Sequence, residues 1–287
     1  MSVILCDSIV DMDKKQLEKL GAVVLPFPYA VNNENKKYEM KSNFDYKEFY
    51  NQTVNQNVYV QSQNITDYIE QFEPFLKKGE DIIYMSYSIR LNPSFNNLKN
   101  ALTYLKNEYP DRNIYFVDTL SVSTGAGIII YEALKLHNNG ASDEDVVRYV
   151  KNNRNNFSAF CAISDTSKIA NASFVEGATQ LKEGKMLSIK PIITINQGKV
   201  EIVSKPIGMK KALRILVNKL KLLGQNVNEY KVYIMHSDYE EGANLLCEKV
   251  REYLGYEADI EIRQIGPIVG MYCKKGAVGI VFHSKAK

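Results

Sequence analysis

The chain has 287 residues, of which 45% are hydrophobic and 24% are charged, and its formal net charge is +3. At roughly 150 residues per domain, this length predicts two soluble globular domains that can each bury a core. The nearly neutral charge, without a basic cluster interleaved with aromatic residues, argues against nucleic-acid binding. No apolar run approaches the roughly 20 residues of a membrane span, and a strand pattern follows Met1 directly. We therefore expect neither a membrane span nor a signal peptide.

The cysteines are far apart in the sequence and do not have the spacing of a metal site. They are Cys6, Cys161, Cys247 and Cys273. Most of them lie in apolar strand or helix patterns, where small buried residues are common. These features predict a reduced, cytoplasmic protein with no metal site and no cofactor.

Strand and helix patterns alternate through the first half of the chain. The predicted strands are Val3–Cys6, Ala22–Phe27, Val58–Gln61, Asp81–Met85 and Ile114–Val117. Asp11 or Asp13 and, further on, Asp45 are candidate N-caps for helices. The polar stretch Asn32–Lys37 predicts a hairpin or an exposed loop. The alternation predicts a parallel sheet covered by helices on both faces.

A polar turn, Ser86–Ser94, joins one of these strands to a helix with apolar residues at helical spacing. Asn92 is the predicted N-cap of that helix, and Pro93 suits its first position because proline has no N–H to leave unpaired. A strand that ends in a hydroxyl-rich turn before a helix N-terminus is a common binding site for anions in α/β proteins. The alternative is a well-capped turn that binds nothing.

The second half of the chain begins after the polar run Lys151–Asn156, so we expect domains over residues 1–156 and 157–287. A strand at Phe157–Ile163 is followed by Ser164–Gly184, which we expect to contain at least one helix. A hairpin follows, around the Gln-Gly of residues 197–198. The later elements mix helices and single strands. The predicted strands are Val232–His236, Ile260–Gln264 and Val278–His283, and the predicted helices surround residues 212–220 and 242–254. This pattern predicts a smaller, mixed α/β domain.

Several short motifs follow one another in a characteristic order over nearly the whole chain. They are Cys6-Asp-Ser8 with Asp11, Leu25-Pro26, Tyr38 with Glu48-Phe-Tyr50, Ser62-Gln63, Ser88 with Arg90-Leu91, Val117-Asp118, Ile189-Lys-Pro-Ile192, Lys210-Lys-Ala212, and Gly266-Pro-Ile-Val-Gly270 with Gly276-Ala277. In order and spacing, the chain resembles the DegV family, bacterial proteins that bind fatty acids and in some members present them to a fatty acid kinase.

The resemblance implies a three-layer α/β/α, Rossmann-like first domain and a smaller two-layer mixed α/β second domain. It also implies a fatty acid whose carboxylate lies at the domain junction and whose tail is buried in the second domain. Hydroxyl and N–H donors suit a carboxylate, and a tail needs only a dry apolar cavity. The residues predicted to contact the headgroup are Gln61, Ser62, Ser88, Asn92, Ser94 and Tyr272.

The chain departs from the family pattern at several functional positions. Gln61 stands where the family has a threonine that donates to the carboxylate, and the Leu-Ser-Gly-Thr turn is here Leu91-Asn-Pro-Ser94. Arginines and a histidine are associated in kinase-coupled members with the phosphorylated headgroup or the kinase. The corresponding positions hold Val175, Ile207, Met209 and Tyr272. The departures argue against a role in phosphoryl relay and leave the fold and an apolar cavity in place.

Two other functions remain open from the sequence: a ligand-free interaction module of the same fold, and a hydrolase with a Ser or Cys nucleophile. His236, Ser237 and Asp238 have the residue types of a catalytic triad. Triad members converge from separate segments and need an oxyanion hole, so three consecutive residues argue against one. The leading expectation is a non-catalytic protein that binds a long-chain fatty acid or a similar amphiphile.

Overall fold

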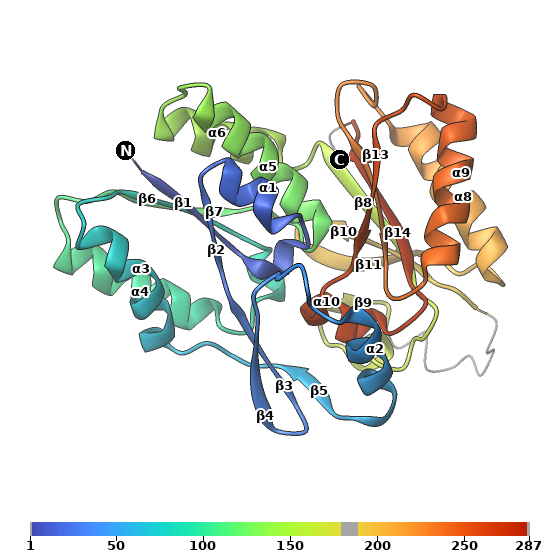
Figure 1. Cartoon of the computed structure of the whole chain (residues 1–287), viewed down its shortest axis with the longest axis horizontal. Coiled ribbons are helices and arrows are strands. Elements are labelled where there is room, and N and C mark those ends of the chain that lie inside the picture. Colours follow the sequence, from blue (N-terminus) through green and yellow to red (C-terminus); the bar gives the residue numbers. More distant parts are fainter. Residues whose placement is uncertain (1, 179–188, 286–287) are drawn as a thin grey trace.

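The computed structural model describes residues 2–178 and 189–285, and its first half is built on a parallel sheet in the order β2-β1-β6-β7 (Figure 1). The strands are β1 (Val3–Asp7), β2 (Ala22–Leu25), β6 (Ile82–Ser86) and β7 (Ile114–Asp118). Every residue of β6 is buried. A central parallel strand has both faces covered, so it carries apolar side chains on both sides.

Helices cover both faces of this sheet. They are α1 (Lys14–Lys19), α3 (Ile65–Leu76), α4 (Phe95–Glu108), α5 (Thr124–Asn138) and α6 (Asp143–Asn153). Leu5 and Tyr84 share a core with α3 and α4, whereas Ile83 and Met85 share one with α5 and α6. The alternation of neighbouring strand residues between the two cores produces the three-layer arrangement seen in Figure 1.

A small antiparallel sheet, β4-β3-β5, extends from the end of β2. Its elements, with the helix that follows β4, are β3 (Phe27–Val31), β4 (Glu34–Tyr38), β5 (Val58–Val60) and α2 (Tyr46–Asn55). Asn32 and Asn33 form the turn between β3 and β4 with φ angles of 48° and 69°. Asparagine tolerates this left-handed conformation, which the favoured two-residue hairpin turn requires. The hairpin expected at Asn32–Lys37 is therefore confirmed.

The second half forms a mixed sheet in the order β13-β12-β14-β8-β10-β11-β9. Its strands are β8 (Phe157–Ala162), β9 (Val175–Glu176), β10 (Ile192–Asn196), β11 (Lys199–Ser204), β12 (Val232–His236), β13 (Ile260–Gln264) and β14 (Val278–His283). Helices α8 (Met209–Leu223) and α9 (Glu240–Leu254) cover its outer face.

The inner face of the mixed sheet points toward the first half of the chain. On β8, Phe160 and Ala162 pack with α8 and α9, whereas Ala159 and Cys161 belong to the core shared with α5. Helix α10 (Pro267–Cys273) adds Ile268 and Met271 to this shared core. One apolar core therefore joins the two sheets.

The expected α/β fold, with a parallel sheet and a separate mixed sheet, is confirmed. The domain boundary between residues 156 and 157 stays a prediction. The helix expected within Ser164–Gly184 can be compared only up to residue 178, because residues 179–184 lie outside the described residues. The described part of that segment contains a short 3-10 helix, η3 (Ile169–Asn171). Within the described ranges, no helix is long and apolar enough to cross a membrane.

The predicted N-cap role of Asn92 for α4 is wrong. The helix begins at Phe95, after Ser94. The Asn92 side chain instead accepts a hydrogen bond of 2.8 Å from the Ser94 N–H, within the turn before the helix. Asparagine often makes this local bond to a backbone N–H two residues later, and here the bond closes a turn rather than starting a helix. Of the two aspartates considered for α1, Asp13 is the cap, because it accepts from Gln16 N–H.

Candidate ligand-binding site

An apolar cavity of about 100 Å³ lies between the two sheets. From the first half of the chain, Ile9, Leu91 and Pro93 line it, next to the carboxyl ends of the parallel strands. From the second half, β10 and α10 contribute Ile195 and Val269. None of the described residues that line this cavity is charged. The cavity therefore suits an apolar group.

A second lobe of about 50 Å³ adjoins this cavity along the inner face of the mixed sheet. The two lobes share Val122, Ile193 and Val269 as lining residues. The second lobe reaches Ala159 and Met235, on β8 and β12. The apolar space thus follows the sheet away from the junction.

Aromatic side chains close one wall of the cavity. The rings of Phe174 and Tyr272 meet edge to face with centroids 5.0 Å apart. Burial raises the pKa of the Tyr272 phenol, and burial raises that of Tyr87 further. Both phenols line the cavity and stay protonated at neutral pH, so each can donate a hydrogen bond to a polar group at the wall.

Three of the predicted headgroup residues, Ser88, Asn92 and Ser94, meet in the turn around η2 (Ile89–Leu91). The Ser88 hydroxyl donates to the Gly198 carbonyl at 2.8 Å and so connects this turn to the β10–β11 hairpin. A Cβ at Gly198, whose φ is +79°, would collide with that hydroxyl. Ser94 Oγ accepts from the Gln63 N–H at 2.8 Å. Because Leu91 and Pro93 line the cavity, the turn itself forms part of its wall.

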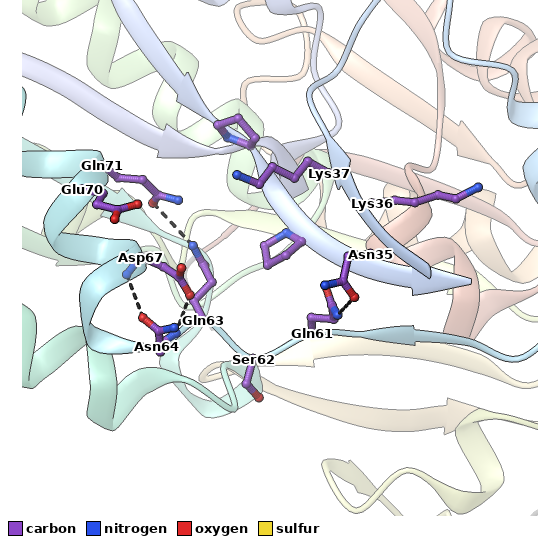
Figure 2. Close-up of a pocket in the computed structure, with 12 residues that line it drawn as sticks. Asn35, Lys36, Lys37, Gln61, Ser62, Gln63, Asn64, Asp67, Glu70 and Gln71 are labelled. Carbon is purple, nitrogen blue, oxygen red and sulfur yellow. Dashed lines mark hydrogen bonds between the residues drawn. The ribbon is translucent and has the colours of Figure 1, made fainter. Parts of the chain in front are cut away.

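Gln61 and Ser62 lie elsewhere, in a polar groove of about 780 Å³ between α3 and the small sheet (Figure 2). The Gln61 side-chain amide donates to Asn35 Oδ1 at 2.5 Å. Figure 2 shows Ser62 pointing away from the other labelled side chains. The structure therefore places these two predicted residues in the lining of the groove and not in the lining of the apolar cavity. Their role in headgroup binding stays a prediction.

A buried carboxylate, Asp11, connects the two halves of the chain next to Ser123, which lines the second lobe. It accepts a hydrogen bond from Ser123 Oγ and another from the Gly266 N–H at the start of α10. Burial raises its pKa to about 7, against the opposing effect of these two hydrogen bonds. A Cβ at Gly266 would collide with Asp11 and with the Tyr38 phenol. Asp11 and Gly266 both fall in the motifs noted above, but the sequence did not indicate that they touch.

The segment His236–Asp238 does not have the geometry of a catalytic triad. His236 Nδ1 accepts from the Tyr239 N–H at 3.1 Å. The Ser237 hydroxyl donates to the Lys274 carbonyl at 2.5 Å and accepts from the Ala277 N–H at 2.7 Å. These bonds fix the loop after β12 and orient no serine toward a histidine, as a triad requires.

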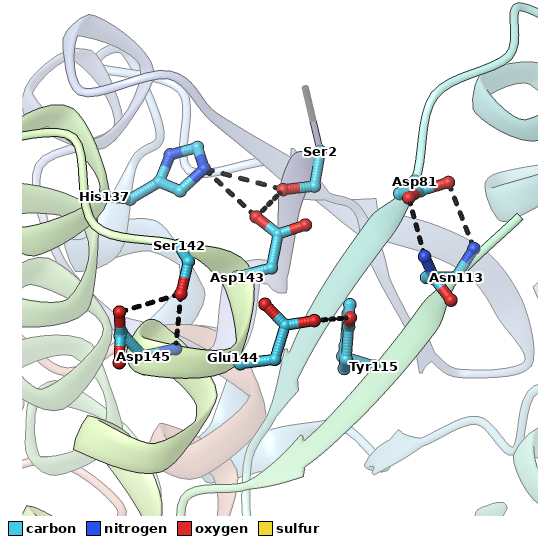
Figure 3. A network of polar contacts seen from close by, with 9 residues as sticks. All are labelled: Ser2, Asp81, Asn113, Tyr115, His137, Ser142, Asp143, Glu144 and Asp145. Carbon is cyan, nitrogen blue, oxygen red and sulfur yellow. Dashed lines mark hydrogen bonds and ion pairs between the residues drawn. The ribbon is translucent and has the colours of Figure 1, made fainter.

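A second group of triad-like residues lies at the opposite edge of the parallel sheet, at the start of its strands (Figure 3). Ser2 Oγ donates to Asp143 Oδ1 at 2.5 Å and lies 3.5 Å from His137 Nε2. Asp143 lies 3.6 Å from the same histidine nitrogen. In a triad the carboxylate and the serine contact different ring nitrogens, so this network does not have the geometry of a triad and instead connects the start of β1 to α5 and α6. Among the described residues, no group of three His, Cys, Asp or Glu could hold a metal ion.

Comparison with known proteins gives a consistent result over the whole chain. A family model described as the DegV family matches residues 1–285. A DegV domain-containing protein of Clostridium perfringens is 29% identical over 287 residues, which cover 99% of this chain and 98% of that protein.

Solved structures share the fold at lower identity. A DegV lipid binding protein from Thermotoga maritima aligns with a TM-score of 0.82 at 22% identity, over 100% of both chains. A stearic acid-binding protein from Eubacterium ventriosum aligns with a TM-score of 0.86 at 17% identity, over 100% of this chain and 99% of that one.

Proposed function

The chain belongs to the DegV family, and on this premise we propose that it is a non-catalytic protein that holds a long-chain fatty acid or a similar amphiphile. The observation that carries the proposal is the uncharged cavity between the two sheets, at the carboxyl ends of the parallel strands. Ligands of α/β proteins commonly bind at this edge of the sheet. Solved relatives of the same fold are described as lipid- or stearic acid-binding proteins, which supports an acyl ligand.

The cavity would receive the tail. Each methylene that leaves water for an apolar site contributes about 0.8 kcal/mol, so a tail alone can supply strong binding. An apolar cavity of about 150 Å³ holds a guest the size of benzene. The two lobes, of about 100 and 50 Å³, must therefore widen to hold a long tail. We expect Phe174 and Tyr272 to move. Neither residue lies in a strand, whereas other parts of the lining belong to β10 and β11 and are held by the hydrogen bonds of the sheet.

The headgroup would lie at the polar turn. Ser94 Oγ already accepts a hydrogen bond from Gln63 and also contacts the Tyr68 phenol, so its O–H must turn from Tyr68 to donate to a carboxylate. The Tyr272 phenol can donate from the other wall. We propose that Ser94 and Tyr272 donate hydrogen bonds to the headgroup. Ser88 and Asn92 shape the turn, and Gln61 and Ser62 lie further from the headgroup, in the polar groove.

The resemblance implies that cationic side chains for a phosphoryl relay are missing from their expected positions in this chain. The resemblance noted above implies arginines at positions 175 and 209 and a histidine at position 272 in kinase-coupled members. Here Val175 and Tyr272 line the cavity, and Met209 begins α8. None of these side chains can stabilise the charge of a transferring phosphoryl group as a cation would. We propose that the protein binds its ligand without passing it to a fatty acid kinase.

The test is denaturing extraction of the purified protein followed by mass spectrometry, with an unrelated protein from the same host as the control. A long-chain acyl species enriched over the control is the expected result. An extract without such a species, together with no uptake of added oleic acid, would refute the proposal and favour a ligand-free interaction module.

A further inference from the structure

The polar groove between α3 and the small sheet shares no lining residue with the apolar cavity, and Gln63 within it has no role in the function proposed above. Its volume, about 780 Å³, is far larger than that of the cavity. Amide side chains dominate its lining. They are Asn35, Gln61, Gln63, Asn64 and Gln71.

Gln63 lies at the base of this groove, and its side chain is not fully paired. Only 2% of the residue is exposed, and its Oε1 has no hydrogen-bond partner among the described residues. Its Nε2 makes one long bond of 3.4 Å to Gln71 Oε1. A buried acceptor without a partner is costly, so each such group in a native protein calls for an explanation, such as a ligand, an ion or a water that binds to it.

The position of Gln63 is fixed by its backbone. Its N–H donates to Ser94 Oγ at 2.8 Å, and its carbonyl accepts from Asn97 Nδ2 at 2.8 Å. These bonds fix the backbone from which the side chain extends, and the burial of the residue restricts the rotamers that the side chain can adopt. A pre-positioned amide is typical of a binding site rather than of a mobile surface residue.

The charges of the groove favour a neutral ligand. Lys36 and Lys37 on β4 are balanced by Asp67 and Glu70 on α3. Figure 2 shows Lys37 extending toward the Gln63–Gln71 pair and Lys36 extending away from it. A fully anionic or cationic ligand would meet charges of both signs. A hydroxyl can donate and accept, and so it can pair with an amide oxygen or an amide N–H in either orientation.

We propose that this groove binds a neutral, hydroxyl-rich group, such as a glycerol or sugar moiety, with Gln63 Oε1 accepting from one of its hydroxyls. The group can come from a free sugar or from the headgroup of an acylated ligand. The second source rests on the proposed function. Val60 lines the apolar cavity and the next residue, Gln61, lines the groove, so the two sites are neighbours along the chain.

The test compares 1-oleoylglycerol, oleic acid and maltose by isothermal titration against the wild-type protein, Gln63→Met and Gln52→Met. Gln52 is an amide on α2 that pairs with Glu48 outside the groove, so its variant is the matched control. Gln63→Met keeps the length of the side chain and removes the unpaired acceptor, so its melting temperature should equal or exceed that of the wild type. If it fails to fold, Gln63→Leu, which also removes the unpaired acceptor, replaces it.

If the group is the headgroup of an acylated ligand, Gln63→Met weakens the binding of 1-oleoylglycerol about tenfold, the effect of one lost hydrogen bond. The affinity for oleic acid stays unchanged. If the group is a free sugar, maltose binds the wild type and Gln52→Met but not Gln63→Met. The inference is overturned if neither hydroxyl-bearing probe binds differently to Gln63→Met and the wild type. Failure of oleic acid and 1-oleoylglycerol alone, with maltose still bound, overturns the proposed function and leaves this inference in place.

Discussion

The buried carboxyl of Asp7 gives the sharpest test of the electrostatics of the fold. Asp7 ends β1 with only 2% of its surface exposed, and burial raises its pKa to about 7. The Tyr84 hydroxyl, 2.9 and 2.8 Å from its two oxygens, opposes this shift. No ion-pair partner is found for it among the described side chains. Asp7 is therefore protonated in the folded protein at a pH where it is ionised in the unfolded chain.

The magnitude follows from the difference between the two pKa values. An ordinary aspartate titrates near about 3.9, and the difference from about 7 corresponds to roughly 4 kcal/mol. Between these two pKa values, Asp7 holds a proton in the folded protein that it has released in the unfolded chain. The contribution of this proton to the free energy of unfolding is complete below about pH 4 and is lost as the pH rises to about 7. Between pH 5 and pH 8, the wild type should lose roughly 2–3 kcal/mol through this residue.

The assay is urea unfolding of the wild type, Asp7→Asn and Asp111→Asn at pH 5, 6, 7 and 8. Asn cannot ionise and keeps an oxygen that accepts from Tyr84, so the free-energy advantage of Asp7→Asn over the wild type should grow with pH. Asp111 is exposed, so its variant should follow the wild type at each pH. A difference between Asp7→Asn and the wild type that stays constant from pH 5 to pH 8 would refute the reasoning.

Three further outcomes are expected. Ser94→Ala should lower the free energy of unfolding by about 1–3 kcal/mol, because the buried Gln63 N–H loses its acceptor, and it should also weaken fatty acid binding. Ser62 is exposed, so Ser62→Ala should leave the stability unchanged in the same melts. Gly266→Ala should cost about 1–3 kcal/mol, because its Cβ meets Asp11 and Tyr38, and a variant as stable as the wild type in urea would contradict the close packing of α10. Lipid-loaded protein with a fatty acid kinase, ATP and Mg²⁺ should give no acyl phosphate, and turnover equal to that of an Arg- and His-bearing relative would contradict this.

Local patterns in the sequence predicted most elements of the fold, but not α10 or the break between β2 and β3 within the predicted strand Ala22–Phe27. Buried strands such as β6 are short apolar runs between turn residues, and α8 places its apolar residues at helical spacing. Alternation of strands and helices indicated the parallel sheet before any contact was known. The cap of α4 was misplaced because Asn92 can close a turn or start a helix, and the sequence alone does not decide between them.

The site was harder to predict because it depends on contacts between distant segments. The hydroxyl-rich turn at Ser88–Ser94 was correctly recognised as a strand-to-helix connection, and it forms part of the cavity wall. Nothing local to Asp11 indicates that its carboxylate meets the N-terminus of α10. Likewise, the unpaired Oε1 of Gln63 becomes visible only in the folded chain, where the side chain is buried beside Gln71.

The central claim is that an acyl tail lies between the two sheets, and the most direct measurement is the anomalous diffraction of a crystal grown with a fatty acid brominated at its terminal carbon. The account predicts a bromine peak inside the apolar core, beside the inner face of the mixed sheet near Ala159 and Met235 in the second lobe. A peak in the polar groove near Gln63, or bromine only on the protein surface, would contradict it.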